Sequence, residues 1–98
     1  MPVNPQLLQV VLRTPESSDV TDSPLVRTVV LQDPANAAQL VPALEEAGTL
    51  QSQNARRILC LFKTDAVPPL LKALASAGAD ARKEGVEILW TILFGESP

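Results

Sequence analysis

The sequence contains no histidine and no tyrosine, one cysteine and one tryptophan. Without histidine, the chain lacks the side chain that most often acts as a general base near neutral pH. A single cysteine excludes an intrachain disulfide framework and is typical of a reducing compartment. Metal-ligand spacings and glycine-rich phosphate loops are also missing. We therefore predict that the protein is not an enzyme and uses no cofactor, metal or small-molecule substrate.

Basic residues are few and scattered, since eight lysines and arginines face eleven acidic residues, for a net charge of −3. Nucleic acid is not an expected partner, because phosphate-backbone binding needs a concentrated basic surface. The longest apolar run, 88–94, is too short to cross a bilayer, and no membrane association is expected. The N-terminus shows no basic stretch followed by an apolar one, as a secretory signal would. We expect an intracellular, cytoplasmic protein, with a nuclear location left open.

Proline marks the starts of several predicted helices. Asn4, Ser23 and Asp33 each precede a proline, and such a pair joins a capping side chain to a residue that needs no N–H partner. No stretch alternates with period two long enough to predict a strand. The prediction for residues 1–98 is one all-α domain of about six helices, arranged as three antiparallel hairpins. The helices are expected at 5–13, 24–32, 34–47 (broken near Pro42), 51–63, 66–77 and 81–94.

The last third of the chain consists of two apolar helical patterns joined by a small-residue turn, and a shorter version precedes it. The Val-Pro pair at 67–68 matches the pair at 41–42, and ILWTI after Glu87 parallels ILCLF after Arg57. Repeated helix pairs are typical of binding scaffolds rather than reaction centres. We predict repeat-like units at 33–63 and 64–95, after a divergent N-terminal hairpin, 1–32, with an exposed loop at 14–22.

Residues 65–93, DAVPPLLKALASAGADARKEGVEILWTIL, resemble the second and third helices of an armadillo repeat. Residues 36–62 resemble them more weakly. HEAT repeats are built from similar pairs of apolar helices. The resemblance implies an armadillo- or HEAT-like α-α superhelix that binds another protein as a scaffold or adaptor. The third helix of that family usually carries an asparagine that clamps an extended peptide. Thr91 occupies this position here, and Leu61 in the upstream copy, so the resemblance does not extend to the asparagine clamp.

A second architecture fits the same length and helix number. It is a compact six-helix bundle of the death-fold type, which would act by homotypic self-association. Shape is the expected discriminator. An elongated, curved layer of hairpins would favour the helical repeat, and a globular bundle of orthogonal helices would favour the death fold.

The last predicted helix is apolar almost all round. Its residues Val86, Leu89, Trp90 and Leu93 follow the i, i+3, i+4, i+7 spacing of one buried face, and Ile88 and Ile92 add a second apolar line. Repeat stacks need polar units at their ends, because an apolar flank otherwise stays in contact with water. We therefore expect this helix to contact a protein partner or a second copy in a homodimer, unless the first hairpin or further repeats cover it.

Several side chains are candidates for partner binding. Arg56 and Arg57 could meet an acidic partner, and the alternative is that they serve solubility and pair locally with Glu45 or Glu46. Trp90 is either an exposed hot spot or a core residue, and its place on the apolar stripe favours the core. The full set of candidates is Arg56, Arg57, Glu87, Trp90, Thr91 and Phe94.

Overall fold

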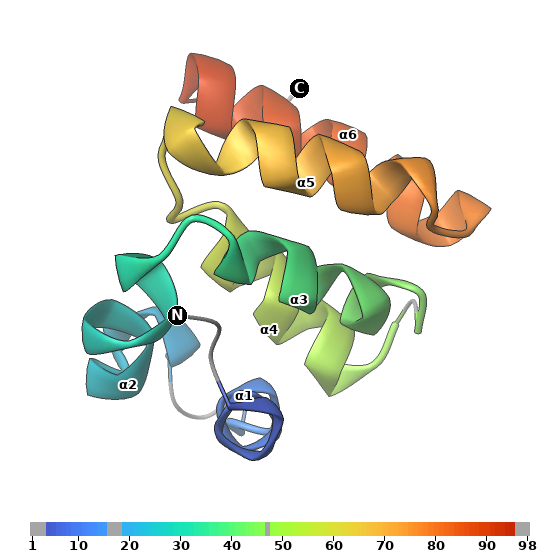
Figure 1. The fold of residues 1–98 in the computed structure, drawn as a ribbon. Helices are drawn as coiled ribbons and strands as arrows, with labels where there is room; N and C mark the ends of the chain where they lie inside the picture. The colour runs from blue at the N-terminus through green and yellow to red at the C-terminus, as the bar shows by residue number, and fades with distance from the viewer. Residues whose placement is uncertain (1–3, 16–18, 47, 96–98) are drawn as a thin grey trace.

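The computed structural model describes residues 4–15, 19–46 and 48–95 (Figure 1). Within these ranges the chain is all helical, as predicted, and contains no strand. The α-helices are α1 (Pro5–Leu12), α2 (Pro24–Thr28), α3 (Asn36–Leu44), α4 (Leu50–Leu59), α5 (Val67–Ala75) and α6 (Ala79–Phe94). Three short 3₁₀ segments are η1 (Val20–Asp22), η2 (Val30–Gln32) and η3 (Thr64–Ala66).

Side-chain capping differs among the predicted helix starts. Asn4 caps α1 as predicted, because its Oδ1 accepts a hydrogen bond from the backbone N–H of Gln6 at 2.8 Å. Ser23 precedes α2, but its side chain makes no capping hydrogen bond. The Asp33 carboxylate accepts a hydrogen bond from the N–H of Ala35 at 3.0 Å. This bond closes a turn just before α3 rather than capping the helix itself.

Two predicted helices differ in their continuity from those observed. The helix expected at 24–32 ends at Thr28 and resumes as η2, because Val29 leaves helical geometry with φ −120° and ψ −59°. The expected break near Pro42 is wrong, since α3 continues to Leu44. A proline inside a helix removes one N–H and frees the carbonyl four residues earlier. Pro42 is exposed and lies close to the end of α3.

The C-terminal half of the molecule consists of two neighbouring helix pairs. Figure 1 shows α5 and α6 side by side and antiparallel, with α3 and α4 as the next pair. Helix α3 packs against α4, α5 and α6, so it occupies the centre of the fold. The largest completely buried apolar side chains come from all of these helices and are Leu40, Leu44, Ile58, Leu59, Leu70 and Ile88.

The N-terminal segment packs partly on α4 and partly on itself. Helix α1 and segment η1 both contact α4, whereas α2 contacts mainly η1 and η2. The expectation of an exposed loop at 14–22 is wrong at Val20, which lies in η1 and is completely buried. Residues 16–18 of that loop lie outside the described residues. The side chain of Asn54 on α4 donates hydrogen bonds to the carbonyls of Leu12 and Thr14, which holds the end of α1 in place.

The overall dimensions are nearly equal, at 27 × 26 × 25 Å, with a radius of gyration of 12.0 Å. Three layers of helices, spaced about 8–10 Å apart, would span about the same distance as the length of α6, the longest helix. A short stack of helix pairs is therefore as isotropic as a compact bundle, and shape does not separate the two architectures at this chain length. The armadillo- or HEAT-like superhelix and the death-fold bundle both stay predictions.

The buried face of α6 joins two small residues to one isoleucine. Ala81, Gly85 and Ile88 are buried, and Gly85 contacts the buried side chain of Leu74 on α5. A glycine at this level allows the two backbones to approach closely, because no β-carbon separates them. The close approach determines which side of α6 faces the core.

The predicted buried face of α6 is wrong in most of its members. Val86, Trp90 and Leu93 are exposed, whereas Leu89 is only partly buried. The observed inner face follows the line of Ile88 and Ile92, which the sequence indicated as secondary. Hydrophobicity alone placed the wrong apolar line of α6 in the core. The small residues at 81 and 85 permit close packing, and they lie on the same side as Ile88.

Candidate protein-interaction surface

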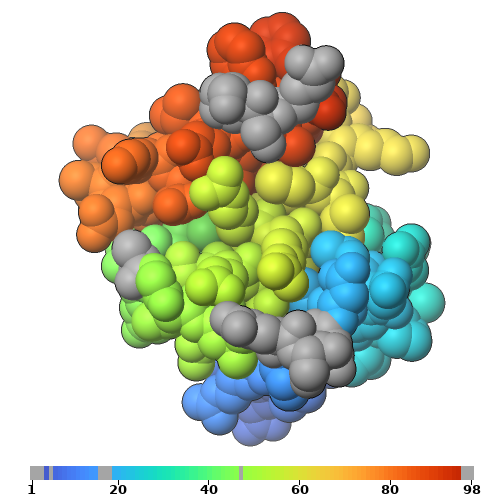
Figure 2. Space-filling model, turned by 180° about the vertical axis from the view of Figure 1, so that it is seen from behind, coloured from blue at the N-terminus to red at the C-terminus, as the bar shows by residue number. Residues whose placement is uncertain are grey.

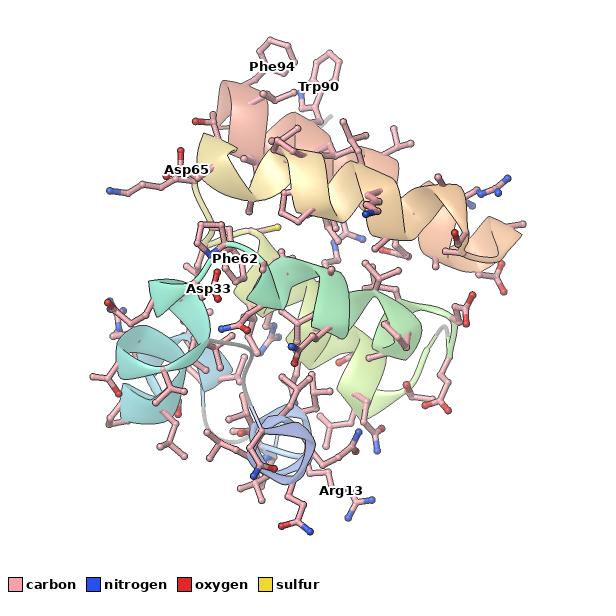
Figure 3. The ribbon with its side chains drawn as sticks, viewed as in Figure 1. Arg13, Asp33, Phe62, Asp65, Trp90 and Phe94 are labelled. Carbon is pink, nitrogen blue, oxygen red and sulfur yellow. The ribbon has the colours of Figure 1, made fainter. Side chains whose placement is uncertain are left out.

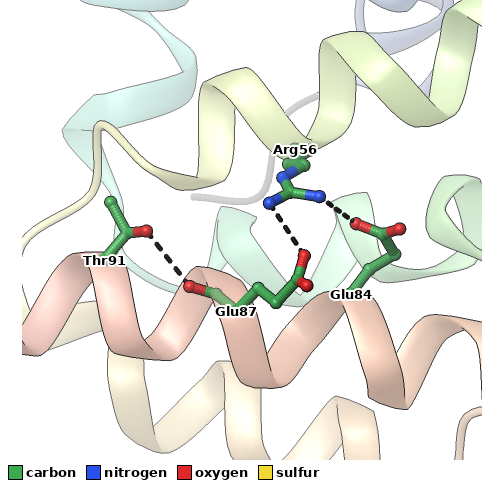
Figure 4. Close-up of polar contacts among 4 residues, drawn as sticks. All are labelled: Arg56, Glu84, Glu87 and Thr91. Atoms are coloured by element: carbon green, nitrogen blue, oxygen red, sulfur yellow. Dashed lines mark hydrogen bonds and ion pairs between the residues drawn. The ribbon is translucent and has the colours of Figure 1, made fainter. Parts of the chain in front are cut away.

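Arg56 joins α4 to α6 through two ion pairs (Figure 4). Its Nη1 donates a hydrogen bond to Oε2 of Glu84 at 2.7 Å, and its Nη2 lies 2.8 Å from Oε2 of Glu87. All three side chains are partly exposed, and such pairs contribute about 0–1 kcal/mol each. The expectation that Arg56 pairs with Glu45 or Glu46 is therefore wrong, because its partners are Glu84 and Glu87.

Glu45 makes a different contact. Its Oε1 accepts a hydrogen bond from the backbone N–H of Gly78 at 2.6 Å. Gly78 is the residue that precedes α6, so this bond links the end of α3 to the start of the last helix. It holds the α5–α6 turn beside α3.

A shallow groove of about 540 Å³ lies beside Arg56. Figure 2 shows this side of the molecule, with α4 exposed between α6 and the light-blue η1 region. Arg57 is exposed and makes no ion pair with any described residue. Hydrogen bonds from Thr21 lower the pKa of Asp19, and the charge of Arg57 lowers it further. The groove is lined by Thr21, Gln53, Arg56, Arg57, Cys60, Leu61 and Thr91.

Cys60 and Thr91 face each other in this groove. Burial raises the pKa of the Cys60 thiol above its ordinary value of 9.0, and the neighbouring Thr91 hydroxyl and the charge of Arg56 offset this only in part. A thiol with a raised pKa stays protonated at neutral pH and is a poor nucleophile. Thr91 also donates a hydrogen bond to the backbone carbonyl of Glu87 at 3.1 Å, a bond drawn in Figure 4.

The exposed side of α6 carries four large apolar side chains. Figure 3 shows Trp90 and Phe94 side by side and pointing away from the rest of the molecule. Their ring centroids are 4.7 Å apart with an interplanar angle of 50°. The interpretation of Trp90 as a core residue is wrong, because 45% of it is exposed. We call the set Val86, Trp90, Leu93 and Phe94 the α6 outer face.

The structure brings the candidate residues to two places on α6 and its neighbour. Glu87 and Thr91 lie next to Arg56, and Arg57 lines the same groove. Trp90 and Phe94 lie on the α6 outer face instead. Glu84, Val86 and Leu93 also belong to these surfaces, although they were not among the predicted candidates. Their signals were available, since Glu84 precedes Glu87 by one helical turn, and Val86, Trp90 and Leu93 share one side of a helix.

The described residues contain no group of three or more histidine, cysteine, aspartate or glutamate side chains that could hold a metal ion. No helix among them is both long and apolar enough to cross a membrane. Comparisons with protein-family models, with curated proteins and with solved structures found no match. The functional conclusion therefore depends on the surface of the chain itself.

Proposed function

We propose that this chain is a non-catalytic protein–protein interaction module, an adaptor or scaffold that binds through the α6 outer face. The observation that carries this proposal is the exposure of that face, from 45% for Trp90 to 64% for Val86. Large apolar side chains gathered on one helix lose contact with water when a partner covers them, which makes binding favourable. Aromatic side chains such as Trp90 and Phe94 are also the residues that most often dominate binding energy.

The arrangement of the helices supports the armadillo- or HEAT-like version of this proposal. In helical repeats each pair is covered by its neighbours, and a terminal pair keeps one uncovered side. The α5–α6 pair packs on α3, while the opposite side of α6 is open. We place this function in the cytoplasm, where the single cysteine would stay reduced.

The groove beside Arg56, between α4 and α6, supplies a polar margin to the proposed surface. Protein interfaces commonly combine an apolar centre with a polar rim. Glu87 and Thr91 are neighbours in sequence of Val86 and Trp90, so the groove begins on the adjacent side of α6. Arg57, which has no ion-pair partner among the described residues, would favour an acidic residue on the bound protein.

The test uses Trp90, which is the only tryptophan of the chain, as a reporter. Affinity capture with the full chain supplies candidate proteins, and each is then purified. The ¹⁵N-labelled chain is titrated with each unlabelled candidate while the single indole N–H signal is followed by NMR. We expect a saturable shift of this signal, because a partner on the α6 outer face changes the surroundings of the indole ring.

Two leucine variants provide the matched comparison. Leu93→Ser removes an apolar side chain from the α6 outer face, where Leu93 is 52% exposed. Leu25→Ser removes one from α2, where Leu25 is 39% exposed. We expect about tenfold weaker binding for Leu93→Ser and unchanged binding for Leu25→Ser. Binding that leaves the indole signal unmoved, or that Leu93→Ser does not weaken, contradicts the proposal.

A further inference from the structure

The α6 outer face has a defined size and a spacing that suit a helix as its partner. Its residues follow i, i+4, i+7 and i+8 from Val86, which is the pattern of a single stripe. From their exposed fractions, these side chains offer roughly 400 Å² of surface. An apolar stripe along one helix is matched best by a similar stripe along another helix.

The two halves of the exposed side of α6 differ in chemistry. Lys83 is exposed one turn before Val86 and makes no ion pair with any described residue. Trp90 and Phe94 form a tilted aromatic pair toward the other end of the helix. A lysine can cover an apolar surface with its methylene chain, and its ammonium group is attracted to the face of an aromatic ring. The lysine end of this stripe therefore complements the aromatic end of the same stripe on another copy of the chain.

We infer that the α6 outer face binds a second copy of this chain, with the two α6 helices antiparallel about a two-fold axis. This inference rests on the proposed protein-binding function and names the partner at the same surface. With the axis at the level of Ile88, Val86 of one copy meets Trp90 of the other. Lys83 of each copy then lies over Leu93 and Phe94 of the other. Such an isologous contact uses one patch twice, as in most homodimers.

The inferred dimer is weak. Stable interfaces take about 800 Å² from each partner, and the α6 outer face offers roughly half of this. We therefore expect a reversible dimer with a dissociation constant between roughly 10 µM and 1 mM. At low concentration the same surface is free to bind a different protein.

The experiment is sedimentation equilibrium of the full chain from roughly 5 µM to 1 mM, with Trp90 fluorescence recorded on the same samples. The chain has one tryptophan and no tyrosine, so its emission reports on this surface alone. We expect the mass to rise from 10.5 kDa toward twice that value. The emission maximum should move to shorter wavelength with the same midpoint, because dimerisation removes water from the indole ring.

Two valines form a matched pair of variants, because Val86 on α6 and Val10 on α1 are each 64% exposed. Helices α1 and α6 lie at opposite ends of the molecule (Figure 1). Val86→Ser should weaken the dimer about tenfold or more, since the substitution enters the interface twice. Val10→Ser should leave the dissociation constant unchanged. Lys83→Glu should weaken it as well, because a carboxylate is repelled by the aromatic face.

A chain that stays monomeric at every concentration overturns the inference. A dimer that leaves the Trp90 emission unchanged, or that Val86→Ser and Val10→Ser affect equally, also overturns it, because the contact would then use another surface. The two proposals fail separately. A monomer whose indole NMR signal still moves with a different protein refutes self-pairing and supports the adaptor function, and a monomer whose signal moves with no protein refutes both.

Discussion

Gly85 of α6 lies directly against Leu74 of α5, so that a β-carbon at position 85 would overlap both δ-methyl groups of Leu74. This contact sets the rotation of α6 about its own axis. Because Gly85 and Ala81 face the core, Val86 and Trp90 face outward. The candidate binding surface is thus a consequence of how closely two helices approach.

We predict that Gly85→Ala lowers the free energy of unfolding. Alanine is intrinsically better than glycine inside a helix by about 1 kcal/mol. The added methyl group also reaches the Cγ of Leu74 at 3.0 Å, so the whole leucine side chain must move within the core. Overpacking of this kind costs about 1–3 kcal/mol, and we expect a net loss of about 1 kcal/mol. Chemical denaturation followed by circular dichroism measures it.

A double-mutant cycle isolates this contact. Leu74→Ala alone should cost about 2–4 kcal/mol, because it leaves a cavity in the core. The combined variant should lose less than the sum of the two single losses, since the alanine at 85 occupies part of the space that Leu74 vacates. Losses that add within about 0.5 kcal/mol would show that the two residues do not compete for space.

We predict a larger loss from Asn54→Ala. The Nδ2 group of Asn54 donates to the carbonyl of Leu12 at 2.7 Å and to that of Thr14 at 2.9 Å, and Asn54 is buried. Its removal leaves two carbonyls at the end of α1 without this donor, which costs about 2–3 kcal/mol. Gln53→Ala is the control, because Gln53 is the exposed neighbour on the same helix and should change stability by less than about 0.5 kcal/mol.

Hydrogen exchange provides a second readout for Asn54. Amide protons of α1 should exchange faster in Asn54→Ala than in the unmodified chain, while those of α5 should change only with global stability. Equal changes in both helices, or a stability loss no larger than that of Gln53→Ala, would argue against this role of Asn54.

The helical class and most helix positions were predictable, because they depend on local chemistry. Asn4 caps α1 through a residue two positions away, and apolar spacing located α4, α5 and α6 within a few residues. The role of Asn54 was not predictable, since its hydrogen-bond partners are 42 and 40 residues away in the sequence. From the sequence alone, a polar residue within a predicted helix is expected to be exposed. Only the tertiary structure shows that a distant acceptor lies beside it.

The candidate surface was predictable only in outline. The final helix was expected to need a partner, yet its two apolar lines could not be ranked by hydrophobicity. The small residues Ala81 and Gly85 decide the ranking, because they permit the close approach of α5. The partners of Arg56 were missed for a related reason. Glu84 is 28 residues away, whereas the expected partner Glu45 is nearer in sequence but faces Gly78.

We predict that Arg56→Met causes a small and salt-dependent loss of stability. The substitution removes both ion pairs with α6 and keeps an apolar stem of similar length. Partly exposed pairs contribute about 0.2–1 kcal/mol each, so the expected loss at low salt is about 0.5–1.5 kcal/mol. At about 1 M sodium chloride the loss should shrink, because salt screens exposed charges. Arg57→Met is the control and should show neither effect, since Arg57 has no ion pair among the described residues.

The stability of the chain should fall in alkaline solution because of Cys60. Burial raises the pKa of this thiol in the folded state above its ordinary value of 9.0. The unfolded chain therefore loses the proton first as the pH rises, and this ionisation stabilises the unfolded state. The contribution of the buried neutral thiol is complete below the unfolded pKa and is lost as the pH rises through the folded pKa. The chain has no tyrosine, so few other side chains titrate in this range.

The measurement compares the unmodified chain with Cys60→Ala by denaturation under reducing conditions between about pH 8 and about pH 10. Cys60→Ala should lose less stability over this interval, although it begins from a lower value because of the lost packing. Thr91→Val should enlarge the pH-dependent loss, because the Thr91 hydroxyl beside Cys60 lowers the pKa of the thiol. Parallel pH curves for all three proteins would mean that Cys60 has the same pKa in the folded and unfolded chains.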